Sequence, residues 1–497
     1  MSTTSPIKDT EAYRDAIATV DKVGKRVWIY PKEPKGRFTN ARTYLSWVLL
    51  ALLFGMPFIK VGGEPLLLFN VIERKFILFG ILFMPQDFHL FVLAMLTFMV
   101  FIILFTVIFG RLFCGWVCPQ TIFMEMVFRK IEYWIEGDAN AQRRLNAAPW
   151  TTEKLIKKSS KQAIFFAIAV LVSNTFLAYI IGAEEVLRIV SEPVSQHLGG
   201  FIAMILFSGA FYFVFSYLRE QVCIAICPYG RLQGVLLDKN SIVVAYDFVR
   251  GEPRGKLQKA PKNKNPLESI ETAVQFSTQT AEPLLAEKAI EFPKLGDCID
   301  CKLCVHVCPT GIDIRNGTQL ECVNCTACID ACDEVMDKID RPRGLIRYDS
   351  YNGIAEHRNR IFTPRVIAYS VFLTVLLAVN VILLGSRGDI ETLMFRTPGM
   401  LYQKVDDTHI SNLYNYEIIN KTNKELPVAF RLATAGGGIR LVGTLKAAKP
   451  GEVIKGAMFI DMETKALDSR KTKLKIEVVS NGKVIDEVTT NFLGPVK

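Results

Sequence analysis

The sequence predicts a multidomain membrane protein, with a bundle of transmembrane helices, a cysteine-rich domain on one side of the membrane and a β-domain on the other. Half of its 497 residues are hydrophobic and only 22% are charged, with a mean hydropathy of +0.25. All twelve cysteines lie between positions 114 and 332. Soluble domains rarely combine so many apolar residues with so few charges, and disulfide scaffolds are typical of small secreted domains. Both features argue against a soluble enzyme or a disulfide-stabilised secreted protein.

Five apolar segments predict helices that cross the membrane. A span needs about 20 mostly apolar residues, and the second segment, 90–109, has this length without a single charge. Two other apolar stretches, 65–70 and 76–85, are too short to span and predict an interfacial or re-entrant loop. The predicted spans are 44–59, 90–109, 162–181, 200–217 and 366–384.

The distribution of Lys and Arg predicts the orientation. The tail before the first span holds nine basic residues and the loop after the second span nine more, whereas the loop between the third and fourth spans holds only Arg188 against three glutamates. Short basic loops stay in the cytoplasm, so the N-terminus is predicted inside and the C-terminus outside. The net charge of +10 follows from this bias, and we expect no nucleic-acid partner.

The polar segments complete the domain plan. Near the C-terminus, Leu474, Ile476 and Val478 alternate with polar residues until Asn481-Gly482 interrupts them, a strong hairpin signal. Several short strands in this region suit an immunoglobulin-like β-sandwich. The predicted parts are a cytoplasmic N-terminal tail (1–43), a four-span membrane domain (44–240), a cytoplasmic dicluster ferredoxin-like domain (241–365), a fifth transmembrane helix (366–385) that completes a five-helix α transmembrane bundle, and a C-terminal periplasmic immunoglobulin-like β-sandwich (386–497).

Two cysteine quartets carry the ferredoxin prediction. The first has the spacing C-x2-C-x2-C-x3-C and is followed by Pro309; the second repeats the spacing but is followed by Asp333. In two-cluster ferredoxins three closely spaced thiolates bind one cluster and the fourth binds the other. A pair of zinc sites is the alternative, although zinc sites more often use two C-x2-C hairpins. The predicted 4Fe–4S ligands are Cys298, Cys301, Cys304 and Cys332 for cluster 1, and Cys322, Cys325, Cys328 and Cys308 for cluster 2.

Two cysteine pairs with the spacing C-x3-C-P follow the second and fourth spans. On a helix, positions i and i+4 share a face, and a tandem repeat of two-span units would bring both pairs towards one point. Soft sulfur ligands select Cu(I), so the sequence predicts a copper or redox site. Disulfide cycling, quinone chemistry and simple packing remain alternatives. The predicted residues, proposed as both copper ligands and catalytic groups, are Cys114, Cys118, Cys223 and Cys227.

The chain resembles the cytochrome c oxidase accessory proteins of the CcoG/FixG/RdxA family, which are membrane-bound and polyferredoxin-like. The resemblance rests on the two C-x3-C-P pairs, the YDFVRGEPRG segment at 246–255, the paired quartets ending in CIDACDEVMDKI at 328–339, and the last span followed by an immunoglobulin-like domain. It implies a multi-pass protein of the bacterial inner membrane that assists maturation of cbb-type cytochrome c oxidase. The implied activity is that of a cupric reductase, an oxidoreductase that converts Cu(II) to Cu(I).

The resemblance also implies partners: oxidase assembly factors, copper chaperones or transporters, membrane lipid, and in one reading a second copy of the chain. No dinucleotide fingerprint, P-loop or haem-attachment motif is found, so electrons are expected from a cytoplasmic or quinol donor. Two alternatives stay open. The first is a quinol dehydrogenase that passes electrons to a respiratory partner, and the second is a non-catalytic assembly scaffold.

Overall fold

The computed structural model describes residues 18–21, 23–61, 63–71, 75–79, 81–83, 87–256, 295–358, 360–399, 401–422, 424–445, 447–449, 451–467 and 469–495. The chain divides into two compact units. The first comprises residues 1–50, 100–170 and 206–370, and the second comprises 51–99, 171–205 and 371–497. The first 17 residues of the predicted N-terminal tail lie outside the described residues.

Five helices are long and apolar enough to cross a membrane, as predicted. The first and third begin earlier than expected because polar turns precede their apolar parts. The fourth ends in a π-helix, η6 (Val214–Leu218). The helices are α1 (Arg37–Gly55, prolonged by the 3-10 turn η2, Met56–Phe58), α2 (Phe88–Phe109), α7 (Thr152–Ile181), α9 (Leu198–Phe213) and α16 (Pro364–Gly385).

Between the first two spans, the described residues contain no helix long enough to cross a membrane, as expected, and they form strands where an interfacial or re-entrant loop was predicted. β3 (Leu67–Asn70), β4 (Lys75–Leu78) and β5 (Ile81–Phe83) pair in order as an antiparallel sheet, after a short hairpin of β1 (Lys60–Val61) and β2 (Glu64–Pro65). Alternate side chains of this sheet, Leu68, Ile77 and Leu82, are buried with Ile419. Runs this short are strands when one face can be buried.

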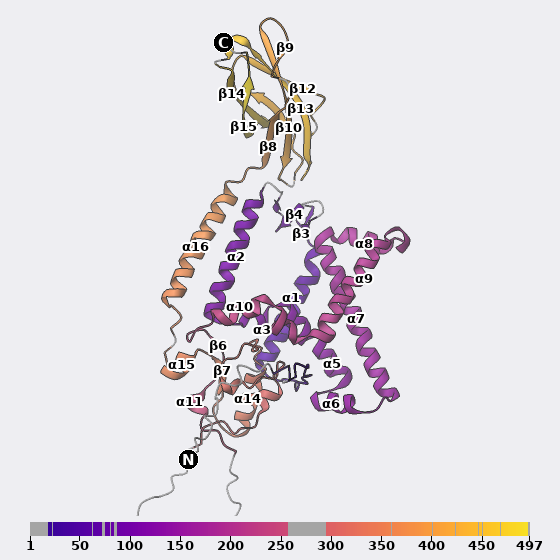
Figure 1. Cartoon of the computed structure of the whole chain (residues 1–497), viewed down its shortest axis with the longest axis vertical. Helices are drawn as coiled ribbons and strands as arrows, with labels where there is room; N and C mark the ends of the chain where they lie inside the picture. The colour runs from indigo at the N-terminus through magenta and orange to yellow at the C-terminus, as the bar shows by residue number, and fades with distance from the viewer. Residues whose placement is uncertain are drawn as a thin grey trace, which may run out of the picture. The chain divides into compact units, whose positions relative to one another are not determined.

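The cysteine-rich part of the first unit is a small two-stranded domain. β6 (Val243–Tyr246) pairs antiparallel with β7 (Ile346–Asp349), and α14 (Ala327–Lys338) packs beside β7 (Figure 1). Its apolar core includes Val244, Met336 and Ile346. The other short elements are α11 (Phe248–Gly251), α13 (Leu303–His306), η8 (Ile314–Asn316) and α15 (Tyr351–Glu356).

Short helices follow the spans of the first unit and carry the cysteine pairs. The first pair lies in α3 (Leu112–Trp116) and at the start of α4 (Pro119–Thr121); the second lies in and after the π-helix η7 (Val222–Ile226), ahead of α10 (Pro228–Leu236). In the described part of the chain, the first unit also has the short helices η4 (Ile122–Phe128), α5 (Arg129–Glu136) and α6 (Ala139–Ala147), and the second unit has α8 (Ala183–Ser191), η5 (Val194–Gln196) and η9 (Thr464–Ala466).

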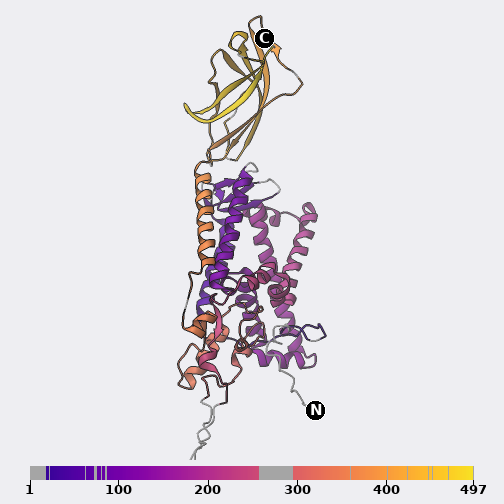
Figure 2. The ribbon, with the colours of Figure 1, turned by 60° about the vertical axis from the view of Figure 1, so that its left-hand side comes forward.

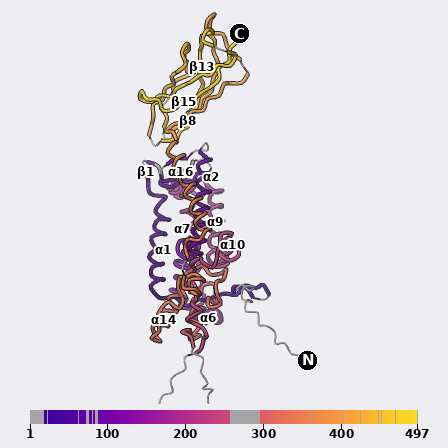
Figure 3. Tube along the Cα trace, turned by 90° about the vertical axis from the view of Figure 1, so that its left-hand side faces the viewer, coloured from indigo at the N-terminus to yellow at the C-terminus, as the bar shows by residue number. Residues whose placement is uncertain are grey.

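The C-terminal region is a sandwich of two antiparallel sheets (Figure 2), as predicted. The chain passes from α16 into β8 (Figure 3). Side chains of both sheets, including Tyr414, Ile418, Leu474 and Phe492, share one core. The larger sheet has the order β12 (Gly437–Val442), β13 (Val453–Glu463), β10 (His409–Asn420), β8 (Ile390–Arg396), with β9 (Gln403–Lys404) on β10; the smaller has the order β11 (Ala429–Leu432), β14 (Lys471–Ser480), β15 (Lys483–Leu493).

The predicted hairpin joins β14 to β15. Asn481 and Gly482 both have positive φ, 48° and 80°, which is the conformation that a two-residue type I′ turn requires.

Candidate metal centres

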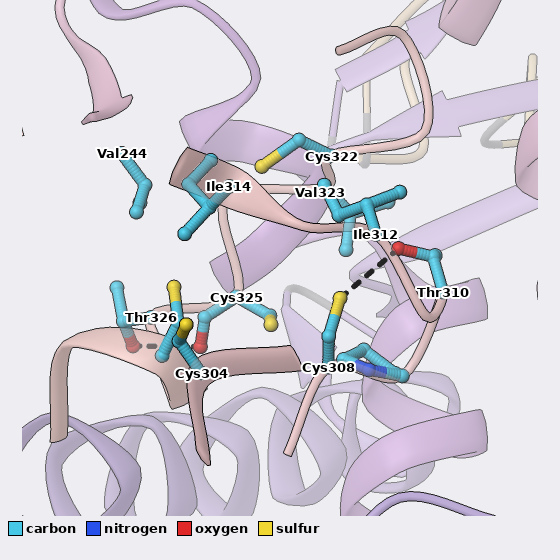
Figure 4. A pocket seen from close by; sticks show the side chains of 12 residues that line it. Val244, Cys304, Cys308, Thr310, Ile312, Ile314, Cys322, Val323, Cys325 and Thr326 are labelled. Carbon is cyan, nitrogen blue, oxygen red and sulfur yellow. Dashed lines mark hydrogen bonds between the residues drawn. The ribbon is translucent and has the colours of Figure 1, made fainter. Parts of the chain in front are cut away.

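The eight quartet cysteines line two adjacent cavities. The first, here the Cys298 site, is lined by Cys298, Cys301, Cys304 and Cys332 and encloses about 360 Å³ of space free of protein atoms. The second, here the Cys322 site, encloses about 350 Å³ and is lined by Cys308, Cys322, Cys325 and Cys328, with Cys304 on the border. In Figure 4 the Cys308 side chain and the side chains of Cys322 and Cys325 line this second cavity from two segments of the chain. In each cavity the fourth cysteine comes from the other quartet.

Both quartets share one backbone conformation. The second residue after the first cysteine has positive φ in each, 51° at Asp300 and 53° at Asn324, and so does the residue after the second cysteine, 57° at Lys302 and 63° at Thr326. Each of the latter residues then accepts hydrogen bonds from the first turn of a helix, α13 or α14. Non-glycine residues rarely adopt this conformation, so its exact repetition at four positions marks a built site rather than a loop.

Burial raises the pKa of six of the eight quartet thiols. It raises the pKa of Cys304, Cys322 and Cys332 to about 12 and that of Cys325 to about 11. Buried thiols therefore stay protonated unless a cation stabilises the thiolate. The walls are mostly apolar, with Val244 and Ile314 over the Cys322 site and Met336 and Leu345 over the Cys298 site. Four cysteines around each mostly apolar cavity, one of them drawn from the other quartet, fit a thiolate-bound iron–sulfur cluster.

The four cysteines of the C-x3-C-P pairs also lie near one another. We call Cys114, Cys118, Cys223 and Cys227 the four-cysteine site. Burial raises the pKa of Cys223 to about 12, and the charges of the other three thiols add to this rise. Among the described residues, no three His, Cys, Asp or Glu side chains are close enough to hold one metal ion. Holding copper with three of these thiols would therefore require rotation of their side chains.

The pairs are not on continuous helices, so the predicted i, i+4 face is wrong. Cys118 precedes Pro119 with ψ 123°, and Cys227 precedes Pro228 with ψ 111°, both outside the helical region. A proline disfavours the helical conformation of the residue before it. Each pair therefore consists of one helical cysteine and one at a break, and the break rather than a helix face sets the direction of the second sulfur.

The first pair packs directly on the loop that carries Cys322 and Cys325. A Cβ on Gly115 would lie 2.4 Å from the Asn324 carbonyl oxygen, so only glycine allows this approach. The Trp116 indole donates to the Tyr348 hydroxyl at 2.8 Å, which in turn donates to the Asn324 carbonyl at 3.3 Å. Gln233 accepts from the Cys114 thiol at 3.1 Å.

Two buried arginines join the same segments. Arg42 donates to the carbonyls of Gly115 at 2.9 Å and Cys325 at 2.8 Å. Arg111 donates to Gln233 Oε1 at 2.9 Å, to the Leu320 carbonyl and, at 3.3 Å, to the Cys322 carbonyl. Sequence reasoning counted both only as basic residues that fix orientation. Nothing in the local pattern around either residue signals these contacts.

Family models match three parts of the chain. A 4Fe–4S dicluster domain matches residues 218–351, a 4Fe–4S binding domain matches 91–137, and a domain described as an IG-like fold at the C-terminal of FixG matches 380–495. The chain therefore contains iron–sulfur binding domains and an immunoglobulin-like C-terminal domain.

Whole-chain comparison finds relatives of similar length. Protein RdxB of Cereibacter sphaeroides is 35% identical over 413 residues, 80% of each chain, and protein RdxA of the same organism is 32% identical over 435 residues, 84% of each chain. The nitrogen fixation protein FixG of Rhizobium meliloti is 35% identical over 341 residues, 67% of this chain and 59% of that protein. A FixG-related protein from Vibrio parahaemolyticus, known from a crystal structure, covers 22% of this chain and 97% of its own, at 20% identity and a TM-score of 0.18.

Proposed function

Because the chain belongs to the FixG/CcoG/RdxA family of membrane iron–sulfur electron-transfer proteins, we propose that it reduces Cu(II) to Cu(I) at the four-cysteine site, as a step in the maturation of cbb-type cytochrome c oxidase. One observation carries the proposal. The Gly115 backbone touches the loop between Cys322 and Cys325, so a metal held by Cys114 and its neighbours would be adjacent to an electron carrier.

Each residue set has a distinct role in this proposal. Cys298, Cys301, Cys304 and Cys332 hold one cluster, and Cys322, Cys325, Cys328 and Cys308 hold the other. When bound, each cluster stores and releases a single electron. One electron from a bound cluster would reduce one Cu(II) to one Cu(I), and the thiols of the four-cysteine site would favour the product because soft sulfur ligands prefer Cu(I). The stored electrons come from a cytoplasmic reductant or a quinol.

The cellular setting is part of the same proposal. In this proposal the N-terminus and both clusters lie on the cytoplasmic side of the bacterial inner membrane and the immunoglobulin-like domain lies in the periplasm, an orientation that the basic loops support. Copper chaperones or transporters deliver or accept the ion there, and oxidase assembly factors bind the protein. The C-terminal domain contains no cysteine, so in this proposal it docks a partner and holds neither copper nor a cluster through thiols.

A second candidate function, quinol oxidation, is favoured by a separate cavity. A cavity of about 390 Å³ lies beside Cys325 at the start of α1, with Lys35, Lys130 and Tyr133 among its lining residues. Pockets of about this size bind small organic ligands. A quinol bound there would release two protons, and its two electrons would fill one cluster each.

The test of the proposed function is an anaerobic copper assay. Purified protein is reduced, Cu(II) is added, and cluster reoxidation is followed by absorbance while a chelator traps Cu(I). We expect one Cu(I) per reoxidised cluster. Replacing all four residues of the four-cysteine site with serine should abolish Cu(I) formation while iron content stays unchanged. An equal rate of Cu(I) formation in that variant would show that copper is not reduced at this site. Bleaching of the oxidised clusters by quinol would favour the second candidate function. Clusters that no reductant reduces would favour an assembly scaffold.

A further inference from the structure

The two iron–sulfur sites differ in how their nearest buried cations are neutralised. At the Cys298 site, Arg315 is 8% exposed and pairs with Asp313 and Asp300, both at 2.6 Å. Its charge is therefore balanced by two carboxylates. At the Cys322 site, Arg42 and Arg111 are 5% and 3% exposed. Within the part of the chain that the structure describes, both donate only to carbonyl and amide oxygens, and neither forms an ion pair.

A buried cation without an anion is costly, because burial removes the water that would solvate it. A negative charge close to both guanidinium groups would therefore stabilise them. The Arg42 side chain ends at the Cys325 carbonyl and the Arg111 side chain at the Cys322 carbonyl. The anion that these positions suit is a thiolate-bound centre at the Cys322 site.

Arg111 also reaches the four-cysteine site. It shares Gln233 Oε1 with the Cys114 thiol. A Cβ on Gly230 would lie 2.6 Å from the Cys223 carbonyl oxygen and 2.7 Å from Nη2 of Arg111, so this guanidinium runs beside the second cysteine pair as well. Arg111 thus lies between both C-x3-C-P pairs and the Cys322 loop.

We propose that Arg42 and Arg111 are positioning residues that raise the reduction potential of the Cys322 site above that of the Cys298 site, and so make the Cys322 site the last carrier before the four-cysteine site. A reduced cluster carries one more negative charge than an oxidised one, and nearby unneutralised cations stabilise it. One electron then moves downhill from the Cys298 site to the Cys322 site with no proton. The direction of this transfer rests on the proposed function, whereas the order of the potentials does not.

The test is a redox titration of the intact protein followed by electron paramagnetic resonance, without copper. The signals are assigned beforehand from Cys301→Ser and Cys325→Ser. In Arg111→Gln and Arg42→Gln we expect the midpoint potential of the Cys322 site to fall towards that of the Cys298 site, which itself stays fixed. Arg111→Lys, which keeps the charge, should restore most of the shift. The matched control is Arg315→Gln, which should change the midpoint potential of the Cys322 site less than either of the other two glutamine variants does.

Each outcome decides the question. Two results would overturn the proposal. One is an unchanged midpoint potential of the Cys322 site in both Arg42→Gln and Arg111→Gln. The other is a lower potential at the Cys322 site than at the Cys298 site in the unmodified protein. If Arg111→Gln loses the iron of the Cys322 site, retention of that iron in Arg111→Lys supports the charge role, and loss in both refutes it in favour of packing. Failure of the copper assay alone would leave the potential order intact and remove only the proposed function.

Discussion

At the scale of single residues, Gly115 marks the closest approach between a membrane cysteine pair and an iron–sulfur site. Gly115→Ala would press a methyl group into the backbone of Val323 and Asn324, where no flexible side chain can yield. We expect a loss of about 1–3 kcal/mol, typical of overpacking, together with slower electron transfer to copper. Thermal unfolding and iron content measure the first effect and stopped-flow absorbance the second.

Gly209→Ala in α9 is the matched control, because the added Cβ meets no atom within 4 Å. Inside a helix this change adds roughly 0.5–1 kcal/mol of stability. If both alanine variants unfold at the same temperature and have equal electron-transfer rates, the close approach at Gly115 contributes neither to stability nor to electron transfer.

Asp87 offers a second residue-scale prediction, in the second unit. It is 3% exposed; burial alone would raise its pKa, but hydrogen bonds from Lys421 and Arg387, both at 2.7 Å, outweigh burial and hold the pKa below its usual value. A lowered folded-state pKa gives stability above the unfolded pKa of about 3.9, lost as the pH falls through the folded value.

Asp87→Ala should therefore cost about 3–5 kcal/mol at pH 7, the effect of breaking a buried ion pair, and progressively less as the pH falls through the lowered folded-state pKa of Asp87. Unfolding temperatures from pH 2.5 to 7 measure this. Asp337→Asn, which breaks an exposed pair with Arg343, should change the unfolding temperature only slightly. A difference between Asp87→Ala and the unmodified protein that does not shrink in acid would contradict the assignment.

At the scale of elements, the proline after each cysteine pair breaks a helix and so aims the second sulfur. Pro119→Ala should let α3 and α4 join and turn Cys118 away from its neighbours. We expect the affinity for Cu(I) to fall roughly 10–100-fold, as for other changes in the support of metal ligands. A competition titration with a chromogenic chelator measures it. Pro364→Ala, at the first residue of α16, is the control, and equal affinities in both variants would refute the role of the break.

Elements were predictable where one local pattern decides them. Uninterrupted apolar length gave the five spans, and Asn481-Gly482 gave the β14–β15 hairpin. The strands β3–β5 could not be foreseen, because their burial depends on Ile419, far away in the sequence. The early start of α7 has the same origin: its polar Lys158 and Lys161 are held by Glu136 on α5.

At the scale of the whole molecule, the candidate ligands followed from repeated spacing, but the connection between sites did not. Arg42 reaches Gly115 across 73 positions and Cys325 across 283. No local periodicity encodes contacts between residues so far apart. The contact between the Cys322–Cys325 loop and the first C-x3-C-P pair is therefore visible only in the three-dimensional structure.

The two units should respond differently to loss of iron. The cysteine-rich domain surrounds two cavities with buried thiols, and metal-dependent domains of this kind unfold when the metal leaves. The C-terminal sandwich has a core of its own without cysteine. After oxidative cluster removal, limited proteolysis of the full chain should cleave within 241–365 while 386–495 stays intact. Equal cleavage of both regions would contradict this expectation.

The meeting of Arg42, Gly115 and Cys325 restricts how such proteins can exchange parts. The three residues come from the first span, the short helix α3 after the second span, and the cluster domain, so no segment that could be swapped as a block contains all of them. A chimaera that takes residues 241–365 from a relative inherits a Cys325 loop shaped for another residue 115 and another residue 42. Recombination at domain borders therefore breaks the junction, unless the donor and the recipient match at these two membrane positions.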